Sequence, residues 1–374
     1  MTTMQSESGL PVNPTPSSTT SSTMSTPSRS NWMLYGAYGS TGRLILDEAL
    51  QRGHRPVLAG RNREPLEALG RETGLETVHM PLENGAALRE ALSRVSCVLL
   101  AAGPYQTTGA PMRAACLDAG TSYLDVNGEI DDFSSALSCD APARAAGIAI
   151  IPGVGYGVVF AECLAAHVAQ RLPDATWLRL SLATQLGARS RGAQLSAAAT
   201  MVSGGREIHH GSLRRRALAF STWSTPGADK ATMRFAAAPL AELVAVQRST
   251  GIPNIVTGIH LSRATATLLW IAGPLLGKMM LRKAERASAT TEPSPSAETL
   301  AALRSRVWAE AGNAKGERVA AMLETGEGYH AAAVAAVRAL ELQLHEPRLG
   351  ALTPVQAFGA GFAALVPGTR IQEL

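Results

Sequence analysis

The chain has 374 residues, of which 46% are hydrophobic and 17% are charged, and its formal net charge is +4. This content is enough for one large or two ordinary domains with buried cores. The small positive excess is not gathered into a basic stripe with interleaved aromatic residues, which argues against nucleic acid as a partner. Four cysteines without a C-x-x-C pair, and no spaced His/Cys/Glu cluster, predict reduced thiols in a cytoplasmic protein and no metal site.

The first segment, residues 1–30, consists mostly of Ser, Thr and Pro and carries almost no charge. It lacks the apolar core of a signal peptide and the repeated arginines of a transit peptide. We therefore expect a disordered tail.

From residue 31 to residue 152, short apolar runs alternate with helical patterns. The expected strands are 32–35, 56–60, 76–80, 96–102, 121–126 and 148–151. The expected helices are 41–52, 64–72, 84–94, 110–119 and 139–146. Such alternation predicts an α/β fold, with a doubly wound parallel sheet of the Rossmann type covered by helices on both faces.

The first expected strand runs into Gly36, Gly39 and Gly42, a G-x-x-G-x-x-G spacing that opens an amphipathic helix. In a dinucleotide-binding turn, the first glycine permits the bend and the second lets the backbone approach the phosphates. The third lets the helix pack close to the strand. The side-chain donors around this loop are Tyr38, Ser40 and Thr41.

The second expected strand ends in Gly60-Arg61-Asn62-Arg63. A site that prefers NAD carries Asp or Glu at this point, roughly 20 residues past the glycines. Two guanidiniums instead match a 2′-phosphate. Arg61 and Arg63, with Asn62 between them, therefore predict NADP as the cofactor.

The fourth and fifth expected strands also end at the cofactor cleft of a doubly wound sheet. Ala102, Gly103 and Pro104 are expected along the dinucleotide, with Tyr105 reaching toward the substrate. The fifth strand closes with Asn127-Gly128-Glu129, where Asn127 and Gly128 are expected to contact the cofactor. Glu129 is either a solvated loop carboxylate or a contact to cofactor or substrate.

A family resemblance rests on these motifs together. They are the glycine turn, Ala59-Gly60-Arg61, Gly103-Pro104-Tyr105, Gly109, Ala115-Cys116, Gly120, Tyr123, Asp125, Gly128 and Glu129. In this combination the chain resembles the NADP-binding domain of the saccharopine dehydrogenase-like oxidoreductases, and within them the trans-acting enoyl reductases. The resemblance continues faintly beyond residue 152, but Gly157 stands where that family usually has Asp, and Ala332 where it usually has Thr.

Residues 153–345 predict a second, α+β domain for substrate binding or dimerisation, and 346–374 a segment that packs back on the body. The expected elements are a strand at 177–186, a helix at 192–203, a hairpin of 303–311 with 317–325 and a helix from 328 to about 344. Residues 285–298 are expected to form an exposed loop. The arginines at 214–216 are either a solvated face or a site for the phosphates of a carrier-bound or coenzyme-A-bound substrate.

The apolar stretch 264–281 is interrupted by Gly273-Pro274 and charged by Lys278, so we do not expect it to span a membrane. It is either a core or dimer-interface helix, or else a wall for a long acyl substrate or a shallow membrane contact.

Hydride transfer usually needs a proton donor for the developing anion. No tyrosine is followed four residues later by Lys, which argues against the short-chain dehydrogenases. Tyr105, Tyr156 and Glu129 are the catalytic candidates. The resemblance implies an NADPH-dependent reductase of a C=C or C=O bond in an acyl or polyketide-like substrate, free or carrier-bound. Two alternatives stay open: saccharopine-type C–N chemistry on an amino acid, and a non-catalytic NADP-binding sensor or scaffold.

Overall fold

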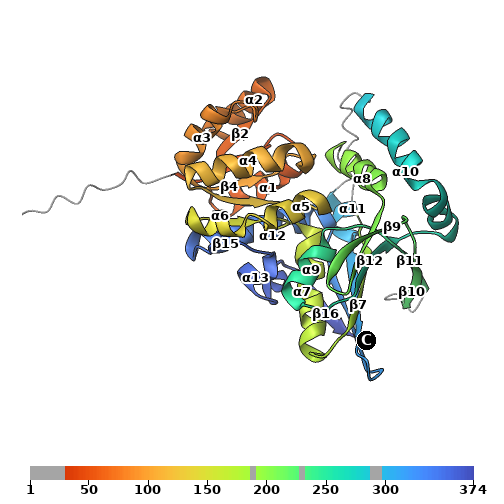
Figure 1. The fold of residues 1–374 in the computed structure, drawn as a ribbon. Helices are drawn as coiled ribbons and strands as arrows, with labels where there is room; N and C mark the ends of the chain where they lie inside the picture. The colour runs from red at the N-terminus through yellow and green to blue at the C-terminus, as the bar shows by residue number, and fades with distance from the viewer. Residues whose placement is uncertain (1–29, 186–190, 227–231, 287–296) are drawn as a thin grey trace, which may run out of the picture.

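The computed structural model describes residues 30–185, 191–226, 232–286 and 297–374. The expected tail and most of the expected loop at 285–298 lie outside the described residues. Two sheets organise the rest of the chain, with the N-terminal sheet on the left and the second sheet on the right of Figure 1.

The first sheet is parallel throughout, in the order β15-β6-β5-β4-β1-β2-β3. Its strands are β1 (Ser30–Tyr35), β2 (Val57–Gly60), β3 (Thr77–His79), β4 (Val95–Leu100), β5 (Ser122–Asp125), β6 (Ala149–Ile151) and β15 (Gly350–Ala351). Its helices are α1 (Ser40–Gln51), α2 (Arg63–Thr73), α3 (Gly85–Ser93), α4 (Tyr105–Ala119), α5 (Ile130–Leu137) and α6 (Asp140–Ala145). The strand order reverses between β1 and β4, which confirms the predicted doubly wound sheet.

Strand β1 shows why this sheet is buried on both faces. Successive side chains of a strand point to opposite faces. Trp32 and Leu34 lie in one hydrophobic cluster, and Met33 and Tyr35 lie in another. All four are almost fully buried, as a central parallel strand requires.

Helix α4 begins at Tyr105, five residues before its predicted start, and α5 was not predicted. Gly109 and Pro111 made the first turns of α4 resemble a loop. In the structure, Gly109 leaves room for a buried ion pair, because a Cβ there would stand 2.6 Å from a carboxylate oxygen of Asp132. Tertiary packing therefore overrides the weak local helix propensity.

The second sheet is mixed and has the path β10-β11-β12-β7-β13-β14-β16, with β8 beside β12 and β9 beside β8. Its strands are β7 (Trp177–Ala183), β8 (Gly205–His209), β9 (Ser212–Arg216), β10 (Thr222–Pro226), β11 (Thr232–Ala237), β12 (Ile255–His260), β13 (Ser305–Gly312), β14 (Arg318–Thr325) and β16 (Arg370–Glu373). The predicted hairpin is confirmed as β13–β14. The arginines at 214–216 lie on β9, which is exposed along its whole length.

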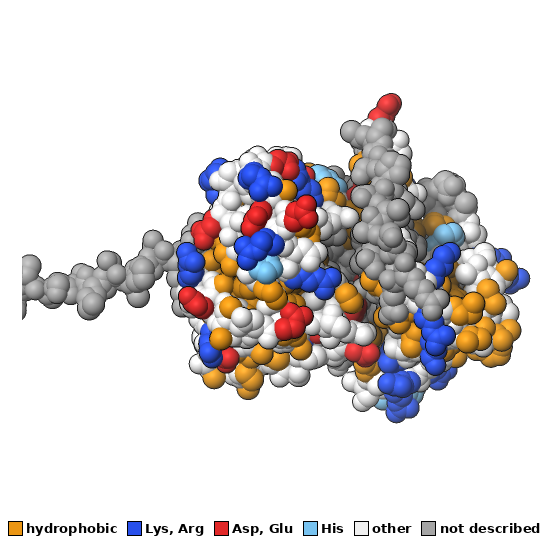
Figure 2. Space-filling model, turned by 90° about the horizontal axis from the view of Figure 1, so that it is seen from above, with side chains coloured by type: hydrophobic (Ala, Val, Ile, Leu, Met, Phe, Trp, Pro, Cys, Tyr) orange, Lys and Arg blue, Asp and Glu red, His pale blue; other side chains and the backbone are white. Residues whose placement is uncertain are grey.

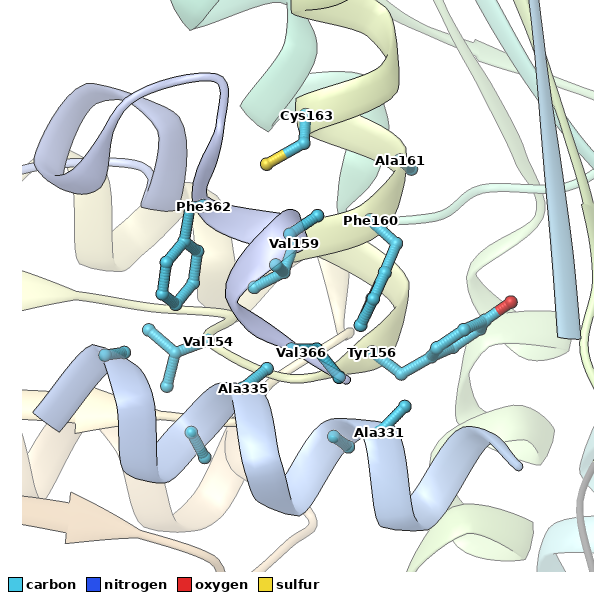
Figure 3. Packing of buried hydrophobic residues seen from close by; sticks show 14 of the residues in the cluster. Val154, Tyr156, Val159, Phe160, Ala161, Cys163, Ala331, Ala335, Phe362 and Val366 are labelled. Atoms are coloured by element: carbon cyan, nitrogen blue, oxygen red, sulfur yellow. The ribbon is translucent and has the colours of Figure 1, made fainter. Parts of the chain in front are cut away.

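The remaining helices are α7 (Tyr156–Arg171), α8 (Arg191–Ser203), α9 (Glu242–Thr250), α10 (Arg263–Arg286), α11 (Ala297–Ala302), α12 (Gly328–His345), α13 (Pro354–Phe358) and the 3₁₀ helix η1 (Phe362–Leu365). Helices α7 and α12 pack together between the two sheets, and Tyr156 and Val159 of α7 share one hydrophobic cluster with Ala331 and Ala335 of α12 (Figure 3). The largest hydrophobic cluster includes Leu34 of β1 and Val307 of β13. The two sheets therefore share one continuous core.

The segment after α12 contributes to both sheets. Strand β15 lies beside β6 at the edge of the first sheet, and β16 lies beside β14 at the edge of the second.

Helix α10 corrects two expectations. It runs without interruption through Gly273-Pro274. Pro274 has no N–H to donate to the Trp270 carbonyl, but it lies on the exposed side of the helix, where water can bind that carbonyl instead. It is also not a core helix: within its apolar segment, Arg263–Lys283, only 17% is buried. By length and composition, this segment is the one helix in the described ranges that could cross a membrane.

Candidate cofactor and substrate cavity

A cavity of about 1030 Å³ lies between the carboxyl ends of the central strands of the first sheet and α8, α10, β11 and β12 of the second domain. The predicted site residues that line it are Gly36, Tyr38, Gly39, Ser40, Thr41, Arg61, Asn62, Ala102, Gly103, Tyr105, Gly128, Glu129 and Tyr156. The predicted residues Gly42, Arg63, Pro104 and Asn127 do not line it.

The glycine turn after β1 is held by close backbone approach. Gly36 has a φ of +87°, and a Cβ there would stand 2.8 Å from the Cβ of Ala102 at the end of β4. A Cβ on Gly42 would stand 2.1 Å from the Gly36 carbonyl oxygen. Gly42 therefore packs α1 against the turn, and its absence from the cavity lining agrees with the packing role predicted for the third glycine.

Helix α1 presents its N-terminus to the cavity. The Gly39 amide is used within the turn, where it donates to the Gly36 carbonyl at 3.0 Å. No side chain caps the helix, and Ser40 and Thr41 of its first turn line the cavity. Uncapped amides and the positive end of the helix dipole suit an anionic group, so the turn fits the diphosphate of a dinucleotide.

The end of β2 carries the side chains expected at the ribose. Tyr38 packs its ring on Gly60, where a Cβ would stand 2.4 Å from the ring, and its hydroxyl accepts a hydrogen bond from the Asn62 amide at 3.1 Å. Arg61 and Asn62 line the cavity beside this ring, and so does Glu83, which was not predicted.

Arg63 does not join Arg61 in the cavity, contrary to the prediction. It is the first residue of α2, where its guanidinium pairs with Glu67 one turn later at 3.3 Å and lies 3.4 Å from Nδ1 of His79. Its side chain is 66% exposed. Of the two arginines, Arg61 is the one that lines the cavity.

Glu129 caps the helix that follows β4. Its carboxylate accepts hydrogen bonds from the backbone amides of Tyr105 and Gln106, each at 3.0 Å, and from the Ser196 hydroxyl of α8 at 2.5 Å. The side chain is almost fully buried. Because both oxygens accept from fixed donors, the Glu129 carboxylate positions α4 and α8 relative to each other.

Pro104 and Asn127 also serve the framework. The Pro104 carbonyl accepts from the amides of Thr107 and Thr108, which builds the first turn of α4. Asn127 is buried, accepts from the Glu129 amide at 2.6 Å and donates to Asp132 at 2.8 Å. Both residues hold the loops that line the cavity without reaching the cavity themselves.

A buried polar network lies behind these loops. Arg113 makes two hydrogen bonds to Asp132, at 2.8 and 2.9 Å. Asp125 accepts from the Tyr123 hydroxyl and from the amides of Asn127 and Gly153. Burial raises the pKa of Asp125 to about 6, although these three donors counteract the effect.

The two candidate tyrosines are both largely buried at the cavity wall. Burial, followed by the charges of Asp125 and Glu129, raises the pKa of Tyr105 well above its usual value. Burial also raises the pKa of Tyr156, whose hydroxyl makes no well-aligned hydrogen bond although Thr184 and Ser305 lie close enough to moderate the shift. Figure 3 shows the Tyr156 hydroxyl directed away from α12. Both phenols stay protonated at neutral pH.

The far end of the cavity is apolar and was not predicted residue by residue. Its wall includes Met201, Leu218, Ala237, Leu240, Ile259 and Leu269, which come from α8, α10, strands β11 and β12 and the connections before β10 and α9. Hydroxyl groups accompany them at Thr184, Thr200 and Tyr329. Local sequence patterns do not reveal the order in which the strands of the second sheet pair. The sequence therefore could not predict that these residues line one cavity.

Glu242 occupies the space beside Gly157 that a side chain at position 157 would need. A Cβ on Gly157 would stand 2.4 Å from a carboxylate oxygen of Glu242. Glu242 opens α9 and is almost fully buried, and burial raises its pKa to about 7.

Comparison with known proteins supports the nucleotide-binding assignment. Residues 36–122 match the family described as NAD(P)H-binding. A trans-acting enoyl reductase of Mycobacterium ulcerans is 37% identical over 105 residues, which are 26% of this chain and 25% of that protein. Its counterpart in Mycobacterium tuberculosis is 35% identical over 105 residues, with the same shares. The chain thus aligns with about a quarter of the length of these curated relatives.

Two solved structures share the fold along most of the chain. Saccharopine dehydrogenase of Saccharomyces cerevisiae matches with a TM-score of 0.60 and 11% identity, over 92% of this chain and 100% of that one. Homospermidine synthase of Legionella pneumophila, solved in complex with NAD, matches with a TM-score of 0.60 and 8% identity, over 92% and 91%. At such identities the likeness concerns the fold alone.

Fold and family model together identify the N-terminal half as an NAD(P)H-binding domain with a doubly wound parallel sheet. Over part of this region its sequence relatives are trans-acting enoyl reductases, and its overall fold is similar to that of saccharopine dehydrogenase.

Replacing Gly39 tests the turn. Gly39 has an ordinary extended φ of −74°, and a Cβ there would meet only the Gly36 oxygen at 3.2 Å. Gly39→Val should therefore keep the fold but weaken dinucleotide binding roughly tenfold or more, because the side chain would stand between backbone and phosphates. Fluorescence titration with NADPH and thermal melting measure the two effects. Gly42→Val should instead lower stability, by about 1–3 kcal/mol or more, through its clash with Gly36. Unaltered NADPH binding in Gly39→Val would contradict the turn assignment.

Replacing Glu129 tests whether its carboxylate caps the start of α4. Glu129→Gln leaves one acceptor oxygen and turns an NH₂ group toward a backbone donor, so the free energy of unfolding in urea should fall by about 1–3 kcal/mol. Glu90→Gln, at an exposed position of α3, is the matched control and should change little. A Glu129→Gln protein as stable as the parent would mean that the carboxylate does not hold the start of α4.

Glu242 predicts a pH dependence. Its folded-state pKa, about 7, lies above the 4.5 of an exposed Glu, so between these values the folded state keeps a proton that the unfolded state has lost. The stabilisation that the protonated Glu242 carboxyl gives the folded state is fully present below pH 4.5, and it is lost as the pH rises through 7. Glu242→Gln should raise the free energy of unfolding at pH 8 by up to about 3 kcal/mol and flatten its decline between pH 5 and 7. Urea unfolding at several pH values measures both, and a decline as steep as in the parent would refute the burial argument.

Proposed function

We propose that this protein is an NADPH-dependent reductase of a C=C (enoyl) or C=O bond in an acyl or polyketide-like substrate. The observation that carries the proposal is the single cavity that joins the glycine turn of α1 to an apolar wall built by α8, α10 and the second sheet. The similarity to trans-acting enoyl reductases supports the choice of an enoyl group, although it covers only the nucleotide-binding part.

The position and chemistry of each cavity residue indicate the role that it would have in the reaction. The turn from Gly36 to Thr41 would hold the diphosphate, and Arg61 with Asn62 would hold the adenosine end. A reduced nicotinamide supplies a hydride when bound. Tyr105 and Tyr156 are protonated and lie at the wall, so either phenol is suited to neutralise the anion that develops on the substrate.

The charges of the cavity argue against the amino-acid alternative. Among the described lining residues, the charged ones are Arg61, Glu83 and Glu129. Arg61 and Glu83 stand at the ribose end, and Glu129 is engaged with two amides and a hydroxyl. A free α-carboxylate would thus find no guanidinium at the apolar end among these residues, and its desolvation would go uncompensated.

Arg61 should decide between NADP and NAD. Arg61→Ala should weaken NADPH binding about 10- to 100-fold and leave NADH binding nearly unchanged, because one charge-assisted contact to the 2′-phosphate is lost. Arg63→Ala is the matched control: it removes the same charge two residues away, from a side chain that faces α2 and His79, and should change neither affinity. Isothermal titration of the parent and both variants with NADPH and NADH measures all six dissociation constants. Equal affinities for NADPH in the parent and Arg61→Ala would overturn the NADP assignment.

Oxidation of NADPH against a panel of acyl thioesters tests the reaction itself. The panel should vary chain length and should offer enoyl, keto and imine groups. We expect oxidation with enoyl or keto thioesters, and faster turnover as the chain grows to fill the apolar end. Activity confined to imines formed from amino acids would favour the saccharopine-type alternative. Stoichiometric NADPH binding without oxidation of any member would favour a non-catalytic sensor or scaffold.

A further inference from the structure

Helix α10 carries a regular apolar stripe on its outer side. Leu268, Ile271, Leu275 and Met279 are 52%, 69%, 63% and 60% exposed. Their spacing of three, four and four residues places them along one side of a helix. Single exposed leucines are ordinary on protein surfaces, but a continuous stripe of this kind marks an interaction site.

The inner side of α10 fixes this orientation. Gly273 and Gly277 lie opposite the stripe, and a Cβ on Gly277 would stand 2.8 Å from the Cβ of Met201 on α8. A Cβ on Gly273 would stand 2.4 Å from a methyl group of Leu218. Helix α10 therefore packs on the body through its glycine side and leaves the stripe facing outward.

The charges beside the stripe are all positive. Residues 263–283 contain Arg263, Lys278, Arg282 and Lys283 and no Asp or Glu. Each of these cations is exposed. Trp270 on the same helix is 58% exposed. Figure 2 shows hydrophobic side chains gathered at the right-hand end of the molecule, with Lys and Arg side chains next to them. An apolar stripe accompanied by cations, on a helix that also exposes an aromatic residue, is typical of a helix that lies in a membrane interface.

We infer that the outer face of α10 docks on a lipid bilayer that carries anionic headgroups, with the helix parallel to the membrane plane. A second copy of the chain is disfavoured as the occupant, because a symmetric contact would bring the cations of two α10 helices together. A spanning arrangement would withdraw α10 from α8 and remove Thr265 and Leu269 from the cavity wall.

Docking in this way brings the cavity to the membrane surface. Met280 lines the cavity and is itself 47% exposed, so the apolar end of the cavity approaches the surface beside the stripe. An apolar molecule leaving the bilayer would have a short path to the cavity. The inference concerns a surface and does not depend on the reaction proposed above.

Vesicle co-sedimentation of the full chain tests the docking. The probes are vesicles of phosphatidylcholine mixed with phosphatidylserine, and vesicles of phosphatidylcholine alone. We expect the protein to bind the mixed vesicles more tightly and the preference to shrink as salt is added. Ile271→Ser with Leu275→Ser should weaken binding to the mixed vesicles about tenfold or more. Lys278→Gln with Arg282→Gln should weaken it roughly 30-fold.

The control variant carries Leu349→Ser with Leu365→Ser, two side chains that are 48% and 43% exposed away from α10. It should bind vesicles like the parent. Thermal melting and NADPH titration of every variant check that the fold and the cofactor site are intact. Absence of vesicle binding in the parent, or equal losses in the control variant, would overturn the inference. A parent dimer that Ile271→Ser with Leu275→Ser converts to a monomer, without any vesicle effect, would instead assign the face to a second copy.

Discussion

The buried ion pair between Arg113 and Asp132 is the constraint on which the nucleotide-binding half depends. Two charges taken out of water are tolerated only when their hydrogen-bonding capacity is filled, and here the Asn127 amide completes the coordination of Asp132. Asn127 in turn fixes the amide of Glu129, whose carboxylate organises the start of α4. One connected network thus links the interior of the sheet to the rim of the cavity, so its members act as a unit rather than as independent contacts.

The network also explains what the sequence could and could not predict. The glycine turn and the strand ends were predictable, because three spaced glycines and apolar runs are local signals with local causes. Gly109, Tyr123 and Asp125 were recognised only as a pattern. The structure gives their reasons: Gly109 makes room for the ion pair, and Tyr123 donates to Asp125. The early start of α4 was missed because its cap comes from Glu129, which is distant in the sequence.

The second domain was predicted less well, for a different reason. The β13–β14 hairpin has a tight turn and strands that pair with their chain neighbour, so local patterns suffice. Strand β12 pairs in parallel with β7, and β9, which carries the arginines, pairs with β8. These pairings depend on the rest of the sheet and leave no local signal in the sequence. The position of Arg63 outside the cavity lining was not foreseen, because Arg61 and Arg63 look equivalent in the sequence. A helix that begins at Arg63 turns its side chain toward Glu67 instead.

The final segment of the chain couples the two sides of the cavity. Strand β15 completes the edge of the first sheet and β16 completes the edge of the second, so the stretch after α12 is hydrogen-bonded to both sheets. Residues 352–369 connect these two strands and include α13 and η1, which pack on α7 between the sheets. A change in the separation of the two sheets would have to be accommodated by this connection, which makes the end of the chain a determinant of the width of the cavity.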